Sequence, residues 1–269
     1  MTLPLYQVDA FSDSLFGGNP ACIVPLDDWL PVATMLQIAK ENAVAETAFF
    51  IIKEDHVALR WFTPEIEMDL CGHATLATAH VLKQEMDYNE PILFKTASGD
   101  LPVAIENDLY VLNLPSRPPE PAKLPIEVSE ALSIQPTAVF MARDYVLLYE
   151  TEQQVKDMVV DQPLLDRINL DPGGVIVTAA GSDCDFVSRF FTPQASILED
   201  PVTGSAHCSL IPFWADRLGK TEMLARQLSE RGGTLYCTLL QDRVLVKGHA
   251  RTYFSGDVFL PLGEGGRGD

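Results

Sequence analysis

Glu46 is a residue whose type and setting point to proton-transfer chemistry. It lies within residues 42–50, between a segment with helical spacing and a segment typical of a strand, and its neighbours are mostly apolar. Burial among apolar groups raises the pKa of a carboxyl group, and a general base that works near neutral pH needs a raised pKa. Glu46 is therefore a candidate general base, with a solvated carboxylate at a helix end as the alternative.

Gly72 and His73 form a second candidate, in a Cys-Gly-His run that precedes an apolar, helix-like segment. A glycine just ahead of a helix lets a ligand approach backbone N–H groups, and the helix dipole favours an anion at that end. His73 would stand at the helix start and could pass protons. The alternative is a packed histidine whose ring bonds a backbone carbonyl.

Asp200 opens a third candidate segment, Asp-Pro-Val-Thr-Gly-Ser at residues 200–205. The proline biases Asp200 toward an extended backbone, which helps to fix its carboxylate. Gly204 and Ser205 could offer backbone and hydroxyl donors to a substrate carboxylate at a second helix start. Aspartate, threonine and serine are also ordinary turn and capping residues, and the sequence leaves open whether Glu199 or Asp200 points inward.

Other kinds of site have little support in the sequence. Cys71 and His73 with His207 and Cys208 could be imagined as four metal ligands, but this is not a usual zinc spacing, so we expect no metal. The Gly-Gly-Asn turn at residues 17–19 lacks the glycine patterns of nucleotide-binding loops, and no Gly-x-Ser-x-Gly elbow of a serine hydrolase occurs.

Two stretches in different halves of the chain repeat one pattern. Arg-Trp-Phe-Thr-Pro at residues 60–64 and Arg-Phe-Phe-Thr-Pro at residues 189–193 lie 129 residues apart. Each is a strand-like run ended by Thr-Pro, followed by a glycine turn and an apolar, helix-like segment. So long a period indicates two similar domains rather than a solenoid, and like turns from like halves can face each other across one cleft.

Each half combines many short strands with one apolar helix. Strand-like patterns cover residues 5–10, 21–25, 47–52, 57–62, 94–96, 101–105, 109–114, 139–140, 146–149, 175–180, 186–191, 235–240, 243–247 and 258–260. Helical spacing covers residues 31–42, 74–83, 153–159 and 204–218. Segment 74–83 is apolar on most sides, as in a helix surrounded by protein. The pattern predicts an α+β fold rather than a doubly wound α/β sheet.

The densest proline cluster, at residues 115–121, lies near the midpoint of the chain. It predicts an N-terminal domain over residues 1–116 and a C-terminal domain over residues 117–269, with a last strand that can return to the first domain. Pro212 lies well inside the predicted helix 204–218, so we expect it to kink or split that helix.

Composition narrows the possible partners. The net charge is −19, which argues against binding nucleic acid or an anionic membrane surface through a basic face. A small anionic substrate remains compatible, because local dipoles can outweigh the overall field inside a cleft. The five scattered cysteines show no Cys-x-x-Cys pair, and we expect neither a signal peptide nor a membrane span. The expectation is a cytoplasmic, reduced protein.

Six segments together resemble the PhzF-like isomerase family of phenazine biosynthesis, relatives of diaminopimelate epimerase. They occur in the family's order and span nearly the whole chain: Val-Asp-Ala-Phe at 8–11, Gly-Asn-Pro at 18–20, Glu-Thr-Ala-Phe at 46–49, Arg-Trp-Phe-Thr-Pro at 60–64, Cys-Gly-His-Ala-Thr at 71–75 and Glu-Asp-Pro-Val-Thr-Gly-Ser-Ala at 199–206. The resemblance implies two similar domains, each a β-barrel-like sheet around a central helix. It also implies an interdomain active site without metal or organic cofactor, and favours a homodimer.

The resemblance implies roles for individual residues. The family's general base matches Glu46, and its histidine and aspartate match His73 and Asp200. Ser205 matches the serine that helps to hold the substrate carboxylate, together with backbone groups of the glycine turns at residues 72 and 204. The epimerase relatives use two opposed cysteines, but here only Cys71 is present and the second turn carries no thiol. Racemisation by two thiols is therefore disfavoured.

The resulting hypothesis is a cofactor-independent isomerase that moves a proton within a small carboxylate substrate, in a biosynthetic process. One alternative is a cofactor-independent racemase or epimerase that uses Cys71 with a partner other than a thiol. Another is a binding protein that kept the fold and lost the chemistry. The sequence names neither the substrate nor the pathway.

Overall fold

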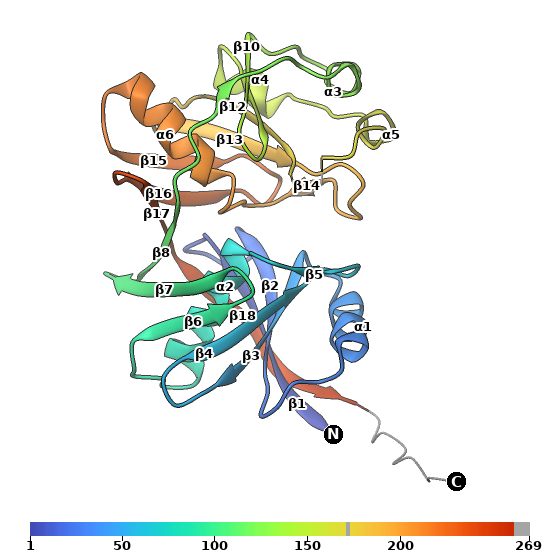
Figure 1. Cartoon of the computed structure of the whole chain (residues 1–269), viewed down its shortest axis with the longest axis vertical. Helices are drawn as coiled ribbons and strands as arrows, with labels where there is room; N and C mark the ends of the chain where they lie inside the picture. Colours follow the sequence, from blue (N-terminus) through green and yellow to red (C-terminus); the bar gives the residue numbers. More distant parts are fainter. Residues whose placement is uncertain (171–172, 261–269) are drawn as a thin grey trace.

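Short apolar strands wrap around one helix in each half of the chain, and this produces two lobes (Figure 1). The computed structural model describes residues 1–170 and 173–260. The lower lobe in Figure 1 contains α2, the strands of the first half and β18 of the second half, and the upper lobe contains α6 and the other strands of the second half. This is the α+β architecture with two similar domains that the sequence predicts.

Eight strands and two helices of the N-terminal half surround or flank the central helix α2. The elements are β1 (Thr2–Ala10), β2 (Asn19–Pro25), α1 (Val32–Asn42), β3 (Glu46–Ile52), β4 (Val57–Phe62), β5 (Glu67–Met68), α2 (Gly72–His80), the π-helix η1 (Val81–Glu85), β6 (Ile92–Thr96), β7 (Gly99–Glu106) and β8 (Leu109–Pro115). Every residue of α2 is buried, as expected for a helix that is apolar on most sides.

The C-terminal half repeats this arrangement around α6. Its elements are β9 (Glu120–Pro121), α3 (Ile126–Ala131), β10 (Ala138–Met141), β11 (Tyr145–Leu148), α4 (Glu152–Lys156), α5 (Gln162–Leu165), β12 (Val175–Ala180), β13 (Phe186–Phe191), β14 (Glu199–Asp200), α6 (His207–Leu218), β15 (Glu222–Gln227), β16 (Gly233–Leu239), β17 (Arg243–Gly248) and β18 (Ala250–Phe259). No helix in the described ranges is both long and apolar enough to cross a membrane.

The strand pairings of the two halves follow the same order. In the first half, β1–β2 is antiparallel, β2–β3 parallel, β3–β4 antiparallel, β4–β6 parallel, and β6–β7–β8 antiparallel. In the second half, β10–β11, β11–β12, β12–β13, β13–β15 and β15–β16–β17 repeat these orientations in turn. The repeated Arg-x-Phe-Thr-Pro motif therefore marks a repeated three-dimensional unit.

Each repeated motif is closed by the same side-chain clamp. Arg60 on β4 makes two hydrogen bonds to the Glu67 carboxylate, at 2.6 and 2.7 Å. Arg189 on β13 makes two to Glu199, at 2.7 and 2.8 Å. Such two-point arginine–carboxylate pairs fix orientation as well as distance, so each clamp holds the loop after its Thr-Pro turn in place.

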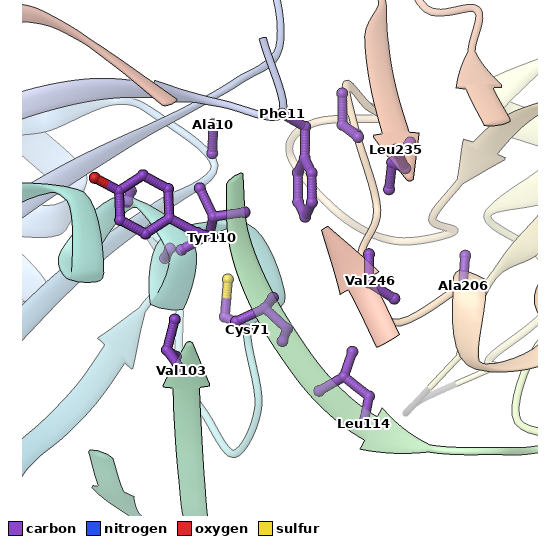
Figure 2. Packing of buried hydrophobic residues seen from close by; sticks show 14 of the residues in the cluster. Ala10, Phe11, Cys71, Val103, Tyr110, Leu114, Ala206, Leu235 and Val246 are labelled. Carbon is purple, nitrogen blue, oxygen red and sulfur yellow. The ribbon is translucent and has the colours of Figure 1, made fainter. Parts of the chain in front are cut away.

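Strand pairs and one aromatic side chain join the lobes. Strand β17 pairs with β8, and β18 returns to pair with β1 of the first half. Phe11 lies between the lobes (Figure 2), where its N–H donates to His249 O at 2.8 Å and its carbonyl accepts from Thr234 N at 3.0 Å. A side chain at Gly248 would clash with the Phe11 ring, because an added Cβ would lie 2.4 Å from it. The proposed boundary near residue 116 stays a prediction.

The helix expected over residues 204–218 differs from the prediction in two ways. It begins at His207, and residues 204–206 form a tight turn before it. It also continues through Pro212 without splitting. Pro212 lacks the N–H that would bond the carbonyl of Cys208, but this carbonyl accepts a hydrogen bond from Arg117 N at 2.9 Å. The proline-rich linker thus supplies the donor that the helix lacks.

Candidate functional site

A cavity with a volume of about 400 Å³ is lined by residues of both halves. All six residues that the sequence predicts as site residues line it: Glu46, Gly72, His73, Asp200, Gly204 and Ser205. They come from the start of β3, the start of α2, the end of β14 and the turn before α6. The fold thus brings the six positions together, while their catalytic roles stay predictions.

Two glycines bring the starts of the central helices into contact. A Cβ added to Gly72 would lie 3.4 Å from the Cα of Gly204, a distance tighter than most real Cβ contacts. Neither α2 nor α6 has a side-chain hydrogen bond at its N-cap in the described structure. The first N–H groups of a helix lack partners within the helix, so the start of α2 can offer donors to an anion. The first N–H groups of α6 bond the carbonyls of residues 204–206, so on that side the turn would supply the donors, and both helices direct a positive dipole end to this place.

Glu46 and His73 form a close pair on the cavity wall. Glu46 Oε2 lies 3.0 Å from His73 Nε2, and the two side chains are 15% and 4% exposed. Glu46 Oε2 is itself buried, and no described group other than His73 is within hydrogen-bond reach of it. A carboxylate so placed has a lone pair for an incoming proton, and the adjacent imidazole can exchange protons with it.

Asn19 connects the histidine to the aspartate from the other lobe. Its Nδ2 donates to Asp200 Oδ1 at 2.7 Å and to the carbonyl of Val202 at 2.9 Å. The same nitrogen lies 3.1 Å from His73 Nδ1. Glu46, His73, Asn19 and Asp200 therefore form one continuous polar chain across the domain interface.

The turn that carries Asn19 is held by an arginine from the second half. Arg231 donates to Gly18 O at 2.8 Å and to Asp9 Oδ1 at 2.7 Å. Gly18 has a φ of +67° and sits against the backbone of Ala10, so only glycine fits there without strain. The Gly-Gly-Asn turn therefore points the Asn19 side chain at the site. The sequence by itself indicates only a turn here.

Asp200 rather than Glu199 faces the cavity. Glu199 is occupied by Arg189 in the clamp described above. Asp200 Oδ2 accepts from the Thr203 hydroxyl at 2.5 Å, and Gln227 Nε2 donates to the Asp200 carbonyl at 2.8 Å. Sequence inspection could not identify Gln227, because it lies on a different strand, 27 residues along the chain.

Burial and neighbouring charges shift the pKa values of three groups in the site: Asp200, His73 and Cys71. Burial raises the pKa of Asp200 to about 6, although the charge on His73 acts in the opposite direction. Burial by itself would lower the pKa of His73, but the neighbouring Cys71 and Glu46 hold it well above its ordinary value. Burial and the Glu46 carboxylate raise the pKa of the Cys71 thiol to about 11. Near neutral pH the Cys71 side chain is therefore a thiol, not a thiolate.

One group of described residues has possible metal-ligand atoms that all lie within 4.8 Å of one another: Glu46, Cys71 and His73. The four-ligand set considered from the sequence does not assemble among them. His207 bonds a backbone carbonyl through Nδ1 at 2.8 Å, and neither His207 nor Cys208 lines the cavity. Two of these groups, Glu46 and His73, are also residues for which the sequence predicts acid–base roles.

Comparison with known proteins gives a consistent picture. A family model described as phenazine biosynthesis-like protein, PhzC-PhzF, matches residues 8–256. An uncharacterized isomerase of Pseudomonas aeruginosa is 46% identical, over 97% of this chain and 100% of that protein. A solved PhzF-family phenazine biosynthesis protein from Enterococcus faecalis matches with a TM-score of 0.91 and 44% identity, over 97% of this chain and 100% of that one.

A solved structure with low sequence identity has a similar fold. A hydroxyproline epimerase from Agrobacterium vitis matches with a TM-score of 0.66, over 96% of this chain and 92% of that one. Its sequence is 10% identical, so the likeness concerns the fold alone. Together with the Enterococcus structure, it confirms the two-domain α+β fold class predicted from the sequence.

Replacing Thr203 by valine should raise the pKa of Asp200 above its value of about 6. The Thr203 hydroxyl donates to the carboxylate and so stabilises the ionised form; its removal favours the protonated form. The measurement is a carbon-13 NMR titration of the Asp200 carboxyl group. Thr203→Ser keeps the hydroxyl and should leave the pKa near the wild-type value. An unchanged or lower pKa in the valine variant would contradict the assignment of this hydrogen bond.

Proposed function

The chain belongs to the family of phenazine biosynthesis-like PhzF proteins, and from that premise we propose that it is a cofactor-independent isomerase. In this proposal it moves a proton within a small carboxylate substrate by general acid–base catalysis. The observation that carries the proposal is the convergence of Glu46, His73 and Asp200 on the cavity where the two glycine turns meet.

Substrate binding follows from the two helix starts. A carboxylate placed between Gly72 and Gly204 would accept hydrogen bonds from backbone N–H groups and from the Ser205 hydroxyl, and would lie at the positive ends of two helix dipoles. These donors are fixed by the fold, so they need no reorganisation when charge develops on the substrate during proton removal.

Proton transfer is assigned to Glu46. It removes a proton from a carbon close to the bound carboxylate, and the electron pair left on that carbon delocalises into the adjacent carboxylate or an unsaturated group. The proton then returns to another carbon, either from Glu46 or through His73 and Asp200. General acid–base catalysis of this kind contributes about 10²- to 10⁴-fold, so positioning in the cavity supplies the remaining acceleration.

The geometry supports one proton carrier rather than two opposed thiols. The pairing of β4 with β5 matches that of β13 with β14, which makes Met68 the counterpart of Asp200. Four residues further on lie Gly72 and Gly204, so the counterpart of Cys71 is Thr203. A threonine hydroxyl bonded to Asp200 cannot serve as the second thiol.

Glu46→Gln should abolish exchange of solvent deuterium into a small carboxylate substrate, with a loss of at least about 10²-fold, while the protein stays folded. Glutamine keeps the shape of the side chain but cannot accept the proton. The measurement is proton NMR of a panel of small carboxylic acids incubated with the protein in deuterium oxide.

Glu54→Gln is the matched control, because Glu54 is exposed in the β3–β4 turn and should exchange at the wild-type rate. Retained exchange in Glu46→Gln would reject Glu46 as the base. A wild-type protein that binds acids of the panel but exchanges none would instead support the alternative of a silent binding protein.

Cys71→Ser should keep most of the deuterium-exchange activity. The thiol is protonated near neutral pH, because its pKa is raised to about 11, and serine differs from cysteine only by an oxygen in place of the sulfur. The same NMR assay measures the effect. A loss as large as that of Glu46→Gln, together with inactivation by thiol alkylation that substrate prevents, would favour the racemase alternative.

A further inference from the structure

Asn19 is a buried amide that lies between three polar groups of the site. It stands at the start of β2, and none of its surface is exposed. Its Nδ2 lies 2.7 Å from Asp200 Oδ1, 2.9 Å from the carbonyl of Val202 and 3.1 Å from His73 Nδ1. An amide nitrogen carries two hydrogens and does not accept hydrogen bonds, so toward all three groups it can only donate.

The partners of Asn19 determine which way its amide group is turned. The Val202 carbonyl can only accept, so the atom that faces it must be the nitrogen. The opposite orientation would place Asn19 Oδ1 against this carbonyl and against the Asp200 carboxylate. The observed orientation avoids both contacts between acceptors, although it leaves Asn19 Oδ1 buried without a hydrogen-bond partner.

The Asn19 amide in turn determines which ring nitrogen of His73 carries a hydrogen. A hydrogen on Nδ1 would meet Asn19 Nδ2, which cannot accept it, so Nδ1 is the nitrogen without hydrogen. Nε2 lies 3.0 Å from Glu46 Oε2, and a carboxylate there favours a hydrogen on the neighbouring nitrogen. Both neighbours therefore favour the same neutral tautomer of the ring.

Cys71 is the other polar neighbour of this ring. Its Sγ lies 3.6 Å from Nδ1 and 4.0 Å from Nε2, so it sits beside the ring rather than in line with either nitrogen. Near neutral pH it is a thiol, which is a weak acceptor and adds no negative charge to stabilise a protonated ring. Of the two charges that raise the pKa of His73, only that of Glu46 then acts against the burial of the ring.

We propose that Asn19 is a positioning residue that holds His73 in the neutral tautomer with its hydrogen on Nε2. This inference deepens the proposed function and rests on it for Glu46 as the base. Because His73 Nδ1 has no hydrogen and the Asn19 nitrogen accepts none, no proton passes between His73 and Asp200 through this amide. A proton from Asp200 must reach the substrate directly.

The consequence for the reaction is that Glu46 is the proton carrier. Its carboxylate takes a proton from one carbon of the substrate and becomes a carboxylic acid, and the electron pair stays on the substrate. The same acid then returns the proton to another carbon and becomes a carboxylate again. The hydrogen on His73 Nε2 stays in place beside Glu46 throughout.

Nitrogen-15 NMR of protein labelled in its histidine rings tests the proposal near neutral pH. The His73 signals are those that are missing from the spectrum of His73→Asn. In the wild-type protein, Nδ1 should give the signal of a nitrogen without hydrogen, and Nε2 that of a nitrogen bonded to hydrogen. A hydrogen on Nδ1, in a charged or a neutral ring, would overturn the proposal.

Asn19→Ala removes the donor beside Nδ1, so a hydrogen should appear on this nitrogen. Deuterium exchange should fall roughly 10-fold or more, because the ring beside the base is no longer held in one state. Asn113→Ala is the matched control: Asn113 is a half-buried asparagine outside the cavity that accepts from Arg243, and its loss should leave the His73 signals unchanged.

A thermal melt shows which variants are folded, and the wild-type spectrum decides the tautomer even if Asn19→Ala is not. An unchanged His73 spectrum in folded Asn19→Ala would reject the role of Asn19. The expected tautomer in a wild-type protein that exchanges no acid of the panel would support the positioning role and count against the proposed function alone.

Discussion

The close approach of two backbones at Gly72 and Gly204 is the constraint on which the site depends. An added Cβ on either glycine would lie 3.4 Å from the Cα of the other, so the helix starts meet as closely as side-chain-free residues allow. Because α2 begins at Gly72 and the turn at residues 204–206 leads into α6, two sets of backbone N–H groups and the positive dipole ends of two helices lie at one place. The interdomain cavity, and the positions of the acids around it, follow from this contact.

The two halves share one fold, but they contribute different functional side chains to the site. Asp200 stands where the first half has Met68, and aligning β3 with β12 puts Gly174 at the position of Glu46. Each acid therefore lacks a counterpart across the approximate symmetry. An active site with two opposed thiols would need a thiol at the equivalent position of each half. A site that moves a proton within one molecule can instead use different residues in the two halves, one as the base and one as the acid.

Much of this organisation can be read from the sequence, because it depends on local patterns. Apolar alternation and the repeated Thr-Pro motif predict the strands, the two enclosed helices and the meeting of the glycine turns. Pro212 was expected to kink or split the helix, and it does not split α6. The sequence could not show that Arg117 N donates to the carbonyl that Pro212 leaves without a donor. Asn19 and Gln227 were missed as site residues for the same reason: their partners lie far away in the chain.

The central claim is that a substrate carboxylate binds between the two glycine turns. Nitrogen-15 NMR of the backbone amides during titration with a small carboxylate tests it most directly. Saturable downfield shifts of the proton resonances of Gly72, Gly204 and Ser205 are expected, because their N–H groups become donors to an anion. If the acid binds while these three amides stay unchanged and others shift, the carboxylate lies elsewhere and the account is wrong.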